Sequence, residues 1–277
     1  MLLDGKKLSE KILNSVKRKL AAKKVKPGLA VILVGQHPAS VAYVRQKKLA
    51  AEKVGFIFRE VNLPSSVSER RLLAEIEKLN RDRKIHGFIV QLPLPDKLDS
   101  RKILERIEPR KDVDGFHPLN FGRGFLGLPT LLPATPAGIL RLLDAYKIPL
   151  KGKNIVVVGH SNIVGKPLAA LLINRDATVS VCHKFTKDLA EFTKKADIVI
   201  SATGVAKLIR AKNLKRGCTV IDAGCAKVGG KLVGDVDFAN VKKIARAITP
   251  VPGGVGPMTV ATLIENTYLA ARNINNF

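Results

Sequence analysis

The stretch from Asn154 to Pro167, NIVVVGHSNIVGKP, constrains the fold of this chain more than any other. Its β-branched run ends at Gly159, which predicts a buried parallel strand closed by a tight turn. Gly165 and Pro167 then open an apolar, helix-forming run. A strand, a glycine turn and a helix N-terminus leave backbone N–H groups free to bind a phosphate. Because Ser161 replaces the second glycine of G-x-G-x-x-G and one extra residue precedes Gly165, a βα turn that binds nothing is an equal alternative.

Strand-like and helix-like segments alternate along most of the chain. In the first half, the segments that predict buried strands or amphipathic helices are 8–22, 29–35, 40–54, 56–63, 68–80 and 86–91. The corresponding segments in the second half are 137–147, 154–159, 164–174, 178–182, 188–195, 197–201, 219–222 and 257–273. We expect Ser40 and Thr135 to cap the helices that follow them, and the irregular segment 96–133 to form a loop.

This alternation predicts an α/β fold of two domains with parallel sheets and right-handed crossovers. Residues 1–134 form the predicted N-terminal α/β domain, and residues 135–256 form a Rossmann-type nucleotide-binding domain. Residues 257–277 contain a C-terminal helix that we expect to pack back on the first domain.

The composition fits a globular protein. A chain of 277 residues, 46% hydrophobic and 26% charged, can form two domains with full cores. Apolar stretches stay shorter than the roughly 18 residues that cross a membrane, and the first residues lack a secretory signal. Cys182, Cys218 and Cys225 do not have the spacing of a metal motif. We therefore expect buried, reduced thiols in a cytoplasmic protein.

The formal net charge of +25 fits nucleic acid, acidic small ligands or a lysine-rich surface. The basic residues are scattered in pairs, and aromatic residues make up only 5% of the chain, without an interleaved pattern for base stacking. We favour a solvated basic surface with anionic metabolites as ligands, and expect neither nucleic acid nor a membrane as a partner.

A few polar residues stand where ligands bind in α/β proteins. Tyr43 and Lys47 are four apart and share one helical face, although a surface lysine beside a half-buried tyrosine is the commoner case. Gln91 ends a buried strand at its carboxyl edge. Asp114 lies in a turn-like segment without other carboxylates at ligand spacing, so we expect no metal site. The glycine-rich loop 250–259 permits close backbone approach to a ligand, or is only a hinge.

Six motifs occur together over essentially the whole chain. They are Tyr43-Val44-x-x-Lys47, Val90-Gln91-Leu92-Pro93-Leu94-Pro95, Lys111-Asp112-Val113-Asp114-Gly115-Phe116-His117, the glycine turn 158–167, Gly234-Asp235-Val236-Asp237-Phe238 and the loop 250–259. In this order they resemble the bifunctional methylenetetrahydrofolate dehydrogenase/methenyltetrahydrofolate cyclohydrolases. The resemblance implies an enzyme of one-carbon metabolism and purine biosynthesis, with a folate cleft between two α/β domains, a nicotinamide cofactor on the second domain, and a homodimer.

The resemblance also implies roles for individual residues. Lys47 corresponds to the catalytic lysine, Gln91 to the glutamine that hydrogen-bonds it, and Tyr43 to the tyrosine that stacks on the folate. The implied residues that bind the tetrahydrofolate substrate are Tyr43, Gln91, Asp114, Pro252, Gly253 and Gly254. The implied residues that bind the cofactor are Gly159, His160, Ser161, Ile163, Gly165, His183, Lys184, Thr203, Gly204 and Cys225.

Departures from the family pattern concentrate in the cofactor half. His160 replaces a common arginine, Ala206 a proline, and Cys225-Ala226 an Ile-Asn pair. NAD-selective domains place a carboxylate about 20 residues beyond the glycine turn, whereas this chain has Lys184 there. We therefore expect NADP, with NAD as the alternative. The other functions left open are a cyclohydrolase with a weak dehydrogenase half, a shikimate or amino-acid type dehydrogenase, and a basic nucleic-acid-binding protein.

Overall fold

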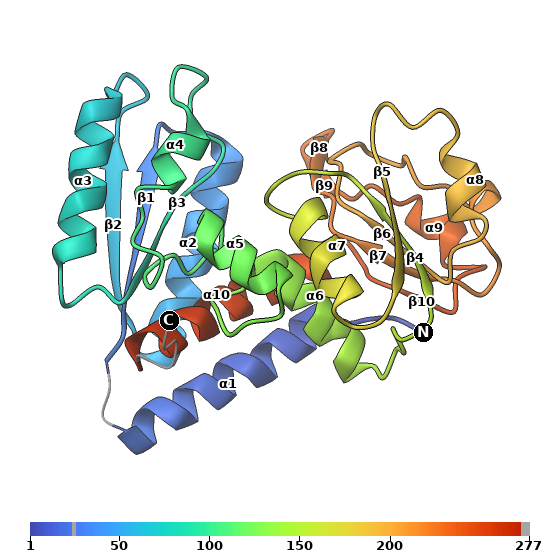
Figure 1. Cartoon of the computed structure of the whole chain (residues 1–277), viewed down its shortest axis with the longest axis horizontal. Coiled ribbons are helices and arrows are strands. Elements are labelled where there is room, and N and C mark those ends of the chain that lie inside the picture. The colour runs from blue at the N-terminus through green and yellow to red at the C-terminus, as the bar shows by residue number, and fades with distance from the viewer. Residues whose placement is uncertain (24–25, 273–277) are drawn as a thin grey trace. The chain divides into compact units, whose positions relative to one another are not determined.

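A computed structural model describes residues 1–23 and 26–272 of the chain. These residues divide into two compact units (Figure 1). Unit 1 comprises Met1–Ser9, Phe125–Gly127 and Thr135–Thr259. Unit 2 comprises the described residues within Glu10–Gly124, Leu128–Ala134 and from Val260 on. This division groups residues 1–9 and 125–127 with the second half of the chain, whereas the sequence-based division placed them in the first.

Unit 2 is built on a three-stranded parallel sheet with the order β2-β1-β3. Its strands are β1 (Gly28–Val34), β2 (Ile57–Leu63) and β3 (Gly87–Val90). The helices whose residues lie wholly or largely in this unit are α1 (Gly5–Lys23), α2 (Pro38–Val54), α3 (Glu69–Arg81), α4 (Ser100–Leu104), α5 (Pro118–Phe125) and α10 (Val255–Ala271). The central strand β1 is buried along its whole length, because helices cover both faces of the sheet.

The two faces of β1 enter two different apolar cores. Leu29, Val31 and Leu33 pack with side chains of α1, α2 and α10. Ala30 and Ile32 face the other way and pack with α3 and α4. The alternation of side chains along a strand produces this division, and it makes unit 2 a three-layer α/β unit (Figure 1).

Unit 1 contains a five-stranded parallel sheet with the order β10-β7-β6-β4-β5. Its strands are β4 (Asn154–Val158), β5 (Thr178–Cys182), β6 (Ile198–Ser201), β7 (Thr219–Asp222) and β10 (Ala247–Ile248). The other elements are α6 (Ala134–Ala145), α7 (Gly165–Ile173), α8 (Leu189–Thr193), the 3-10 helix η1 (Ala211–Asn213), α9 (Phe238–Val241) and a hairpin of β8 (Ala226–Val228) and β9 (Lys231–Val233). The strand order reverses beside β4, which creates the switch point where doubly wound sheets bind ligands.

The α/β class and the parallel sheets are confirmed, but several local expectations were wrong. Helix α2 begins at Pro38 after His37, so Ser40 lies inside the helix instead of capping it. Helix α6 begins at Ala134, so Thr135 is likewise helical. The segment expected to be a loop contains the short helices α4 and α5. The expected end of the last helix at Asn273 falls outside the described residues.

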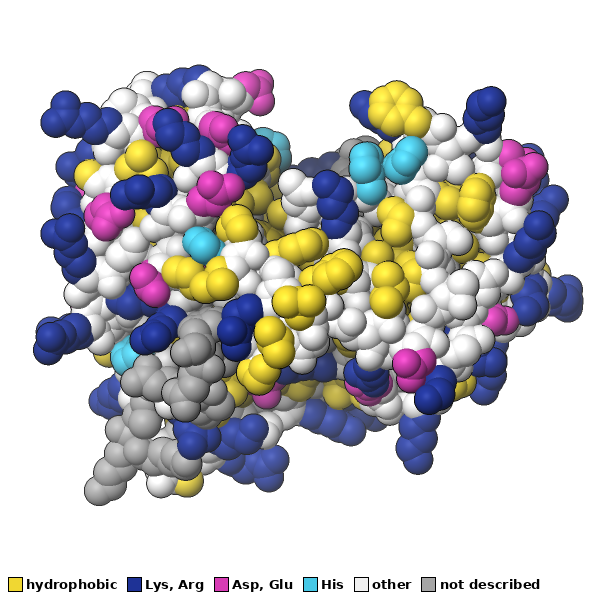
Figure 2. Space-filling view, in the orientation of Figure 1, with side chains coloured by type: hydrophobic (Ala, Val, Ile, Leu, Met, Phe, Trp, Pro, Cys, Tyr) yellow, Lys and Arg dark blue, Asp and Glu magenta, His cyan; other side chains and the backbone are white. Residues whose placement is uncertain are grey.

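The structure shows where the basic residues and the cysteines of this chain lie. Lys and Arg side chains are spread over the face shown in Figure 2 rather than gathered in one patch. Among residues 1–23 and 26–272, no helix combines the length and apolarity needed to cross a membrane. Cys182 and Cys218 are buried thiols as expected, whereas Cys225 is exposed, because it lies just before the β8–β9 hairpin.

Candidate active site

Lys47 of α2 is buried, and its ammonium group donates a 2.9 Å hydrogen bond to the side-chain oxygen of Gln91. Gln91 directly follows β3 at its carboxyl end, and its own amide donates to the carbonyl of Leu92. This hydrogen bond to Leu92 fixes the orientation of the Gln91 amide, so the amide oxygen faces Lys47. The structure therefore brings together the two residues that the sequence placed on separate elements.

Burial lowers the pKa of Lys47, because a charged ammonium loses its hydration in the interior. The negative charge of Asp114 acts in the opposite direction and raises that pKa. Burial also raises the pKa of Asp114, while Lys47 lowers it and Asp112 raises it. Lys47 and Asp114 are therefore electrostatically coupled.

The loop that carries Asp114 is held by its neighbour Asp112, which is 1% exposed. The Asp112 carboxylate accepts hydrogen bonds from the backbone N–H groups of Gly115 (3.1 Å) and His117 (2.8 Å). It also accepts one of 2.9 Å from the side-chain amide of Asn120. Sequence reasoning quoted Asp112 within its motif but assigned it no role, since a turn carboxylate gives no signal of its burial.

The same loop is attached to strand β3. The N–H of Phe88 donates a 2.9 Å hydrogen bond to the carbonyl of Lys111, and Phe88 pairs with Asp112 in a parallel bridge. The approach requires glycine at 87, because a Cβ there would lie 2.2 Å from Cγ1 of Val113. Strand β3 thus supports both Gln91 at its end and the segment leading to Asp114 at its side.

The remaining substrate candidates lie on two different units. Tyr43 is half-buried on α2, one helical turn before Lys47, and belongs to unit 2. Pro252, Gly253 and Gly254 belong to unit 1, where the carbonyl of Gly253 accepts a hydrogen bond from the N–H of Lys6. Gly254 lies against Gly5, where a Cβ would be 1.9 Å from the Gly254 carbonyl oxygen.

In unit 1, the turn after β4 has the features of a dinucleotide-binding turn. Gly159 has φ +114°, a conformation that favours glycine, and a Cβ there would meet the carbonyl of Ala202 at 2.5 Å. A Cβ on Gly165 would lie 2.0 Å from the carbonyl oxygen of Gly159, so α7 packs directly on the turn. Close helix–strand packing is the role of the last glycine in such motifs, and these residues fit the pyrophosphate of a dinucleotide.

The segment after β5 presents positive and aromatic side chains. His160 of the glycine turn lies beside His183, with ring centroids 4.7 Å apart. The Nδ1 atom of His183 accepts from the N–H of Phe185, so a proton on the neutral ring resides on Nε2 and can be donated. Lys184 is exposed, and the carboxylate of Asp188 is engaged in capping α8. This set fits a phosphate on the adenosine ribose better than a free 2′-hydroxyl.

The other cofactor candidates are distributed around the same sheet edge. Ser161 is exposed, and its hydroxyl accepts from the N–H groups of Val164 and Gly165 at the start of α7. Ile163 is 36% exposed. Thr203 and Gly204 follow β6, and Cys225 lies between β7 and β8. All of these residues therefore lie after the carboxyl ends of β4, β5, β6 or β7.

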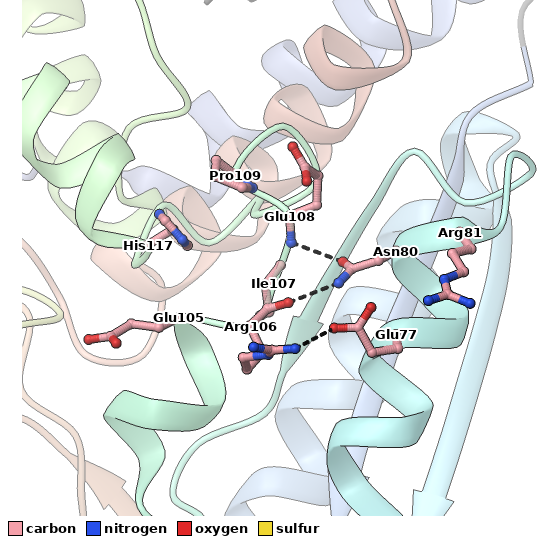
Figure 3. Close-up of a pocket in the computed structure, with 9 residues that line it drawn as sticks. All are labelled: Glu77, Asn80, Arg81, Glu105, Arg106, Ile107, Glu108, Pro109 and His117. Atoms are coloured by element: carbon pink, nitrogen blue, oxygen red, sulfur yellow. Dashed lines mark hydrogen bonds and ion pairs between the residues drawn. The ribbon is translucent and has the colours of Figure 1, made fainter.

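A separate pocket in unit 2 does not include these candidates (Figure 3). It is lined by Glu77, Asn80, Arg81, Glu105, Arg106, Ile107, Glu108, Pro109 and His117. Several of its polar groups bind each other: Asn80 bonds the backbone of Arg106 and Glu108, and Arg106 pairs with Glu77. Among the described residues, no group of three or more His, Cys, Asp and Glu side chains could hold a metal ion.

Comparison with known proteins gives matches over the whole chain. Residues 3–114 match the family model of the tetrahydrofolate dehydrogenase/cyclohydrolase catalytic domain. Residues 133–275 match the NAD(P)-binding domain of the same family. The bifunctional protein FolD of a Nitratiruptor species is 55% identical over 275 residues, covering 98% of this chain and 98% of that protein.

Solved structures agree with these matches. The bifunctional methylenetetrahydrofolate dehydrogenase/cyclohydrolase FolD of Campylobacter jejuni has a TM-score of 0.96 and 50% identity, covering 99% of both chains. The FolD of Trypanosoma brucei, solved with NADP cofactor and inhibitor, has a TM-score of 0.95 and 37% identity, covering 100% of this chain and 99% of that one.

Proposed function

Because this chain belongs to the tetrahydrofolate dehydrogenase/cyclohydrolase family, we propose that it catalyses two successive steps of one-carbon metabolism. In the first, 5,10-methylenetetrahydrofolate is oxidised by NADP⁺ to the 5,10-methenyl cation. In the second, water adds to that cation, and loss of a proton and ring opening give 10-formyltetrahydrofolate. The observation that carries the proposal is the buried Lys47 held by Gln91 in a chain of this family.

Lys47 is the proposed general base of the hydrolytic step. Burial lowers its pKa, so a larger fraction of the amine is neutral near neutral pH and can accept a proton from the attacking water. Gln91 offers Lys47 an oxygen acceptor and no charge, so it orients the amine without stabilising the ammonium as a carboxylate would. Tyr43 offers an aromatic face on the same side of α2, on which a folate ring can stack.

Asp114 is the proposed pterin-binding residue. A carboxylate accepts two hydrogen bonds, which suits the amino group and ring N–H of a pterin. Its loop is held rigidly by Asp112, so the carboxylate is already oriented before substrate binds. The backbone of Pro252, Gly253 and Gly254 completes the proposed substrate-binding set.

The proposed cofactor is NADP, which supplies the hydride acceptor when bound. Gly159 and Gly165 let the turn after β4 pack tightly on Ala202 and on the start of α7, where the pyrophosphate is proposed to bind. Lys184 offers positive charge to a 2′-phosphate, and His160 offers a hydrogen bond. We place the folate-binding domain at 1–134 with 257–277, and the cofactor domain at 135–256. The family models, which divide the chain between residues 114 and 133, support the boundary near 134. The second model runs on to residue 275, so the return of 257–277 to the first domain is supported instead by the packing of α10 side chains against β1.

We also propose a cytoplasmic homodimer. Exposed apolar side chains in unit 1, such as Leu126 (70% exposed) and Phe125 (53%), support burial against a second copy. The buried free thiols suit a reducing compartment. Light scattering of the purified protein tests the dimer directly.

The test of the proposed function is an absorbance assay with 5,10-methylenetetrahydrofolate and each cofactor in turn, followed by separation of the methenyl and formyl products. We expect NADPH and 10-formyltetrahydrofolate to form. Hydrolysis of supplied methenyltetrahydrofolate without oxidation of the methylene compound would show that the protein is a cyclohydrolase without dehydrogenase activity. Absence of both activities would refute the proposal.

A further inference from the structure

The motif Gly234-Asp235-Val236-Asp237-Phe238 contains a buried acid to which neither proposed reaction assigns a role. Asp235 is fully buried in unit 1, just after β9. Its Oδ2 atom accepts three hydrogen bonds: from the hydroxyl of Ser201 (2.7 Å), the N–H of Thr203 (2.7 Å) and the hydroxyl of Thr203 (2.8 Å). The carboxylate therefore fixes the loop that follows β6.

The same side chain also contacts the loop that follows β7. Its Oδ1 atom is buried without a hydrogen-bond partner among the described residues and faces Gly224. A Cβ on Gly224 would lie 1.9 Å from that oxygen, so only glycine lets this loop pack against the carboxylate. Asp235 thus touches both loops, and it does so at the carboxyl edge of the five-stranded sheet.

A second acid, Asp222, locks Asp235 in place. Asp222 ends β7, and its Oδ1 accepts the N–H groups of Gly224 and Asp235, both at 3.0 Å. Its Oδ2 accepts the N–H of Val236 at 2.9 Å. The backbone around Asp235 is thereby tied to β7, while its side chain is tied to the end of β6.

The two loops have a defined relation to a dinucleotide. In doubly wound sheets the cofactor crosses the carboxyl ends of the strands, with its pyrophosphate at the first glycine turn. Here that turn follows β4, and the segment suited to the adenosine ribose follows β5 on one side. The loops after β6 and β7, on the other side of β4, are left to receive the nicotinamide half.

We propose that Asp235 is a positioning residue for the cofactor, which holds the loops after β6 and β7 at the spacing that receives the nicotinamide half of NADP. This inference rests on the proposed dehydrogenase function. Burying two neighbouring carboxyl groups costs free energy of folding. Such a cost is retained where the surrounding structure depends on the geometry that the two groups hold.

The bifunctional reaction provides an internal control. Hydrolysis of supplied methenyltetrahydrofolate requires no cofactor, and its proposed residues Lys47 and Gln91 belong to unit 2. In Asp235→Asn, we expect the Kd for NADP⁺, measured by calorimetry, to rise about tenfold while the cyclohydrolase rate is unchanged. Asp237→Asn is the matched control, because the carboxylate of this acid, from the same motif, accepts a hydrogen bond from the Asn240 side chain near the surface and should leave the Kd unchanged when replaced.

A second measurement separates positioning from mere packing. We expect the amide hydrogens of Thr203 and Gly224 to exchange faster in cofactor-free Asp235→Asn than in the wild type, and NADP⁺ to slow them less. If Asp235→Asn loses both activities through misfolding, Ser201→Ala removes one of the three bonds more gently and should raise the Kd about threefold.

Three results are distinguishable. A wild type that binds no NADP⁺ refutes the proposed dehydrogenase function itself. A wild type that binds NADP⁺, with unchanged Kd in Asp235→Asn, or in Ser201→Ala where the first variant does not fold, overturns the positioning role. A raised Kd with intact cyclohydrolase activity supports it.

Discussion

Lys47 and Lys184 are both lysines at candidate sites, but their surroundings are opposite. Lys47 is 7% exposed, hydrogen-bonded to Gln91 and electrostatically coupled to Asp114. Lys184 is exposed, and it lies in a turn with its ammonium group over the ring of Phe185. A buried side chain needs every neighbour in place, whereas an exposed one can be replaced with little effect on folding. Substitutions around Lys47 should thus be poorly tolerated, whereas substitutions around Lys184 should alter the cofactor preference without disturbing the fold.

The largest expected effect comes from Lys47→Met, which keeps the length of the side chain but removes the base. We expect the cyclohydrolase rate to fall by roughly 100-fold or more. Lys48→Met changes the exposed neighbour and should leave the rate unchanged. Near-wild-type hydrolysis of methenyltetrahydrofolate by Lys47→Met would contradict the assignment.

Asp114→Asn should weaken folate binding, because a charge-assisted hydrogen bond contributes about 1.5–3 kcal/mol. We expect the KM for methenyltetrahydrofolate to rise by about ten- to a hundredfold. Asp96→Asn, in an exposed segment, is the control. Incubation of the wild type with a chelator should change nothing; loss of activity that a divalent ion restores would instead assign Asp114 to a metal.

The same variant tests the coupling of the two charges through pH. A general base must be unprotonated, so the wild-type cyclohydrolase rate should fall as pH falls through the lowered pKa of Lys47. Asp114 raises that pKa, so its removal should move the inflexion of the pH–rate profile to lower pH. A profile that stays in place, or moves to higher pH, would show that the two groups are not coupled.

Lys184→Ala tests the exposed side of the comparison. Loss of a charge-assisted contact to the 2′-phosphate should reduce the preference for NADP⁺ over NAD⁺ in kcat/KM about tenfold. Lys194→Ala removes an exposed charge at the end of α8 and serves as the control. An unchanged preference, or a wild type that prefers NAD⁺, would refute the cofactor assignment.

The smallest expected effect is that of His160→Ala. A hydrogen bond from a neutral imidazole contributes about 1 kcal/mol, so we expect a loss of NADP⁺ preference of only about fivefold. His160→Arg should increase the preference, because arginine binds phosphate with two charged donors. Equal kinetics for all three proteins would remove His160 from the cofactor site.

The sequence predicted the parts of the fold that follow from hydrophobic periodicity. The strand near 28–34 and the helix bearing Lys47 are long, regular segments, and the structure has both. The caps were mispredicted because Pro38 can occupy the first turn of a helix, so α2 begins before the better capping residue Ser40. Helix α5 was missed because its glycines and proline are typical of loops.

Site residues were predictable where a motif carried them, and their energetics were not. The spacing of Tyr43 and Lys47 indicates a shared face, but burial of Lys47 and its coupling to Asp114 depend on elements far apart in sequence. Asp235 illustrates the limit: its three bonds to the end of β6 join residues more than 30 positions apart. A local sequence pattern does not indicate which distant residues pair in this way.

Strand β3 packs so closely on the segment before Asp114 that residues 87–117 must be inherited together for this site to be kept. Because Gly87 has no room for a Cβ beside Val113, and Phe88 is bonded to Lys111, strand and loop fit only as a matched pair. A loop 111–117 with a bulkier side chain at position 113 would displace β3, which Gln91 follows, and with it the partner of Lys47. Recombination between such enzymes should therefore succeed when the crossover leaves 87–117 intact, and fail when it falls between strand and loop.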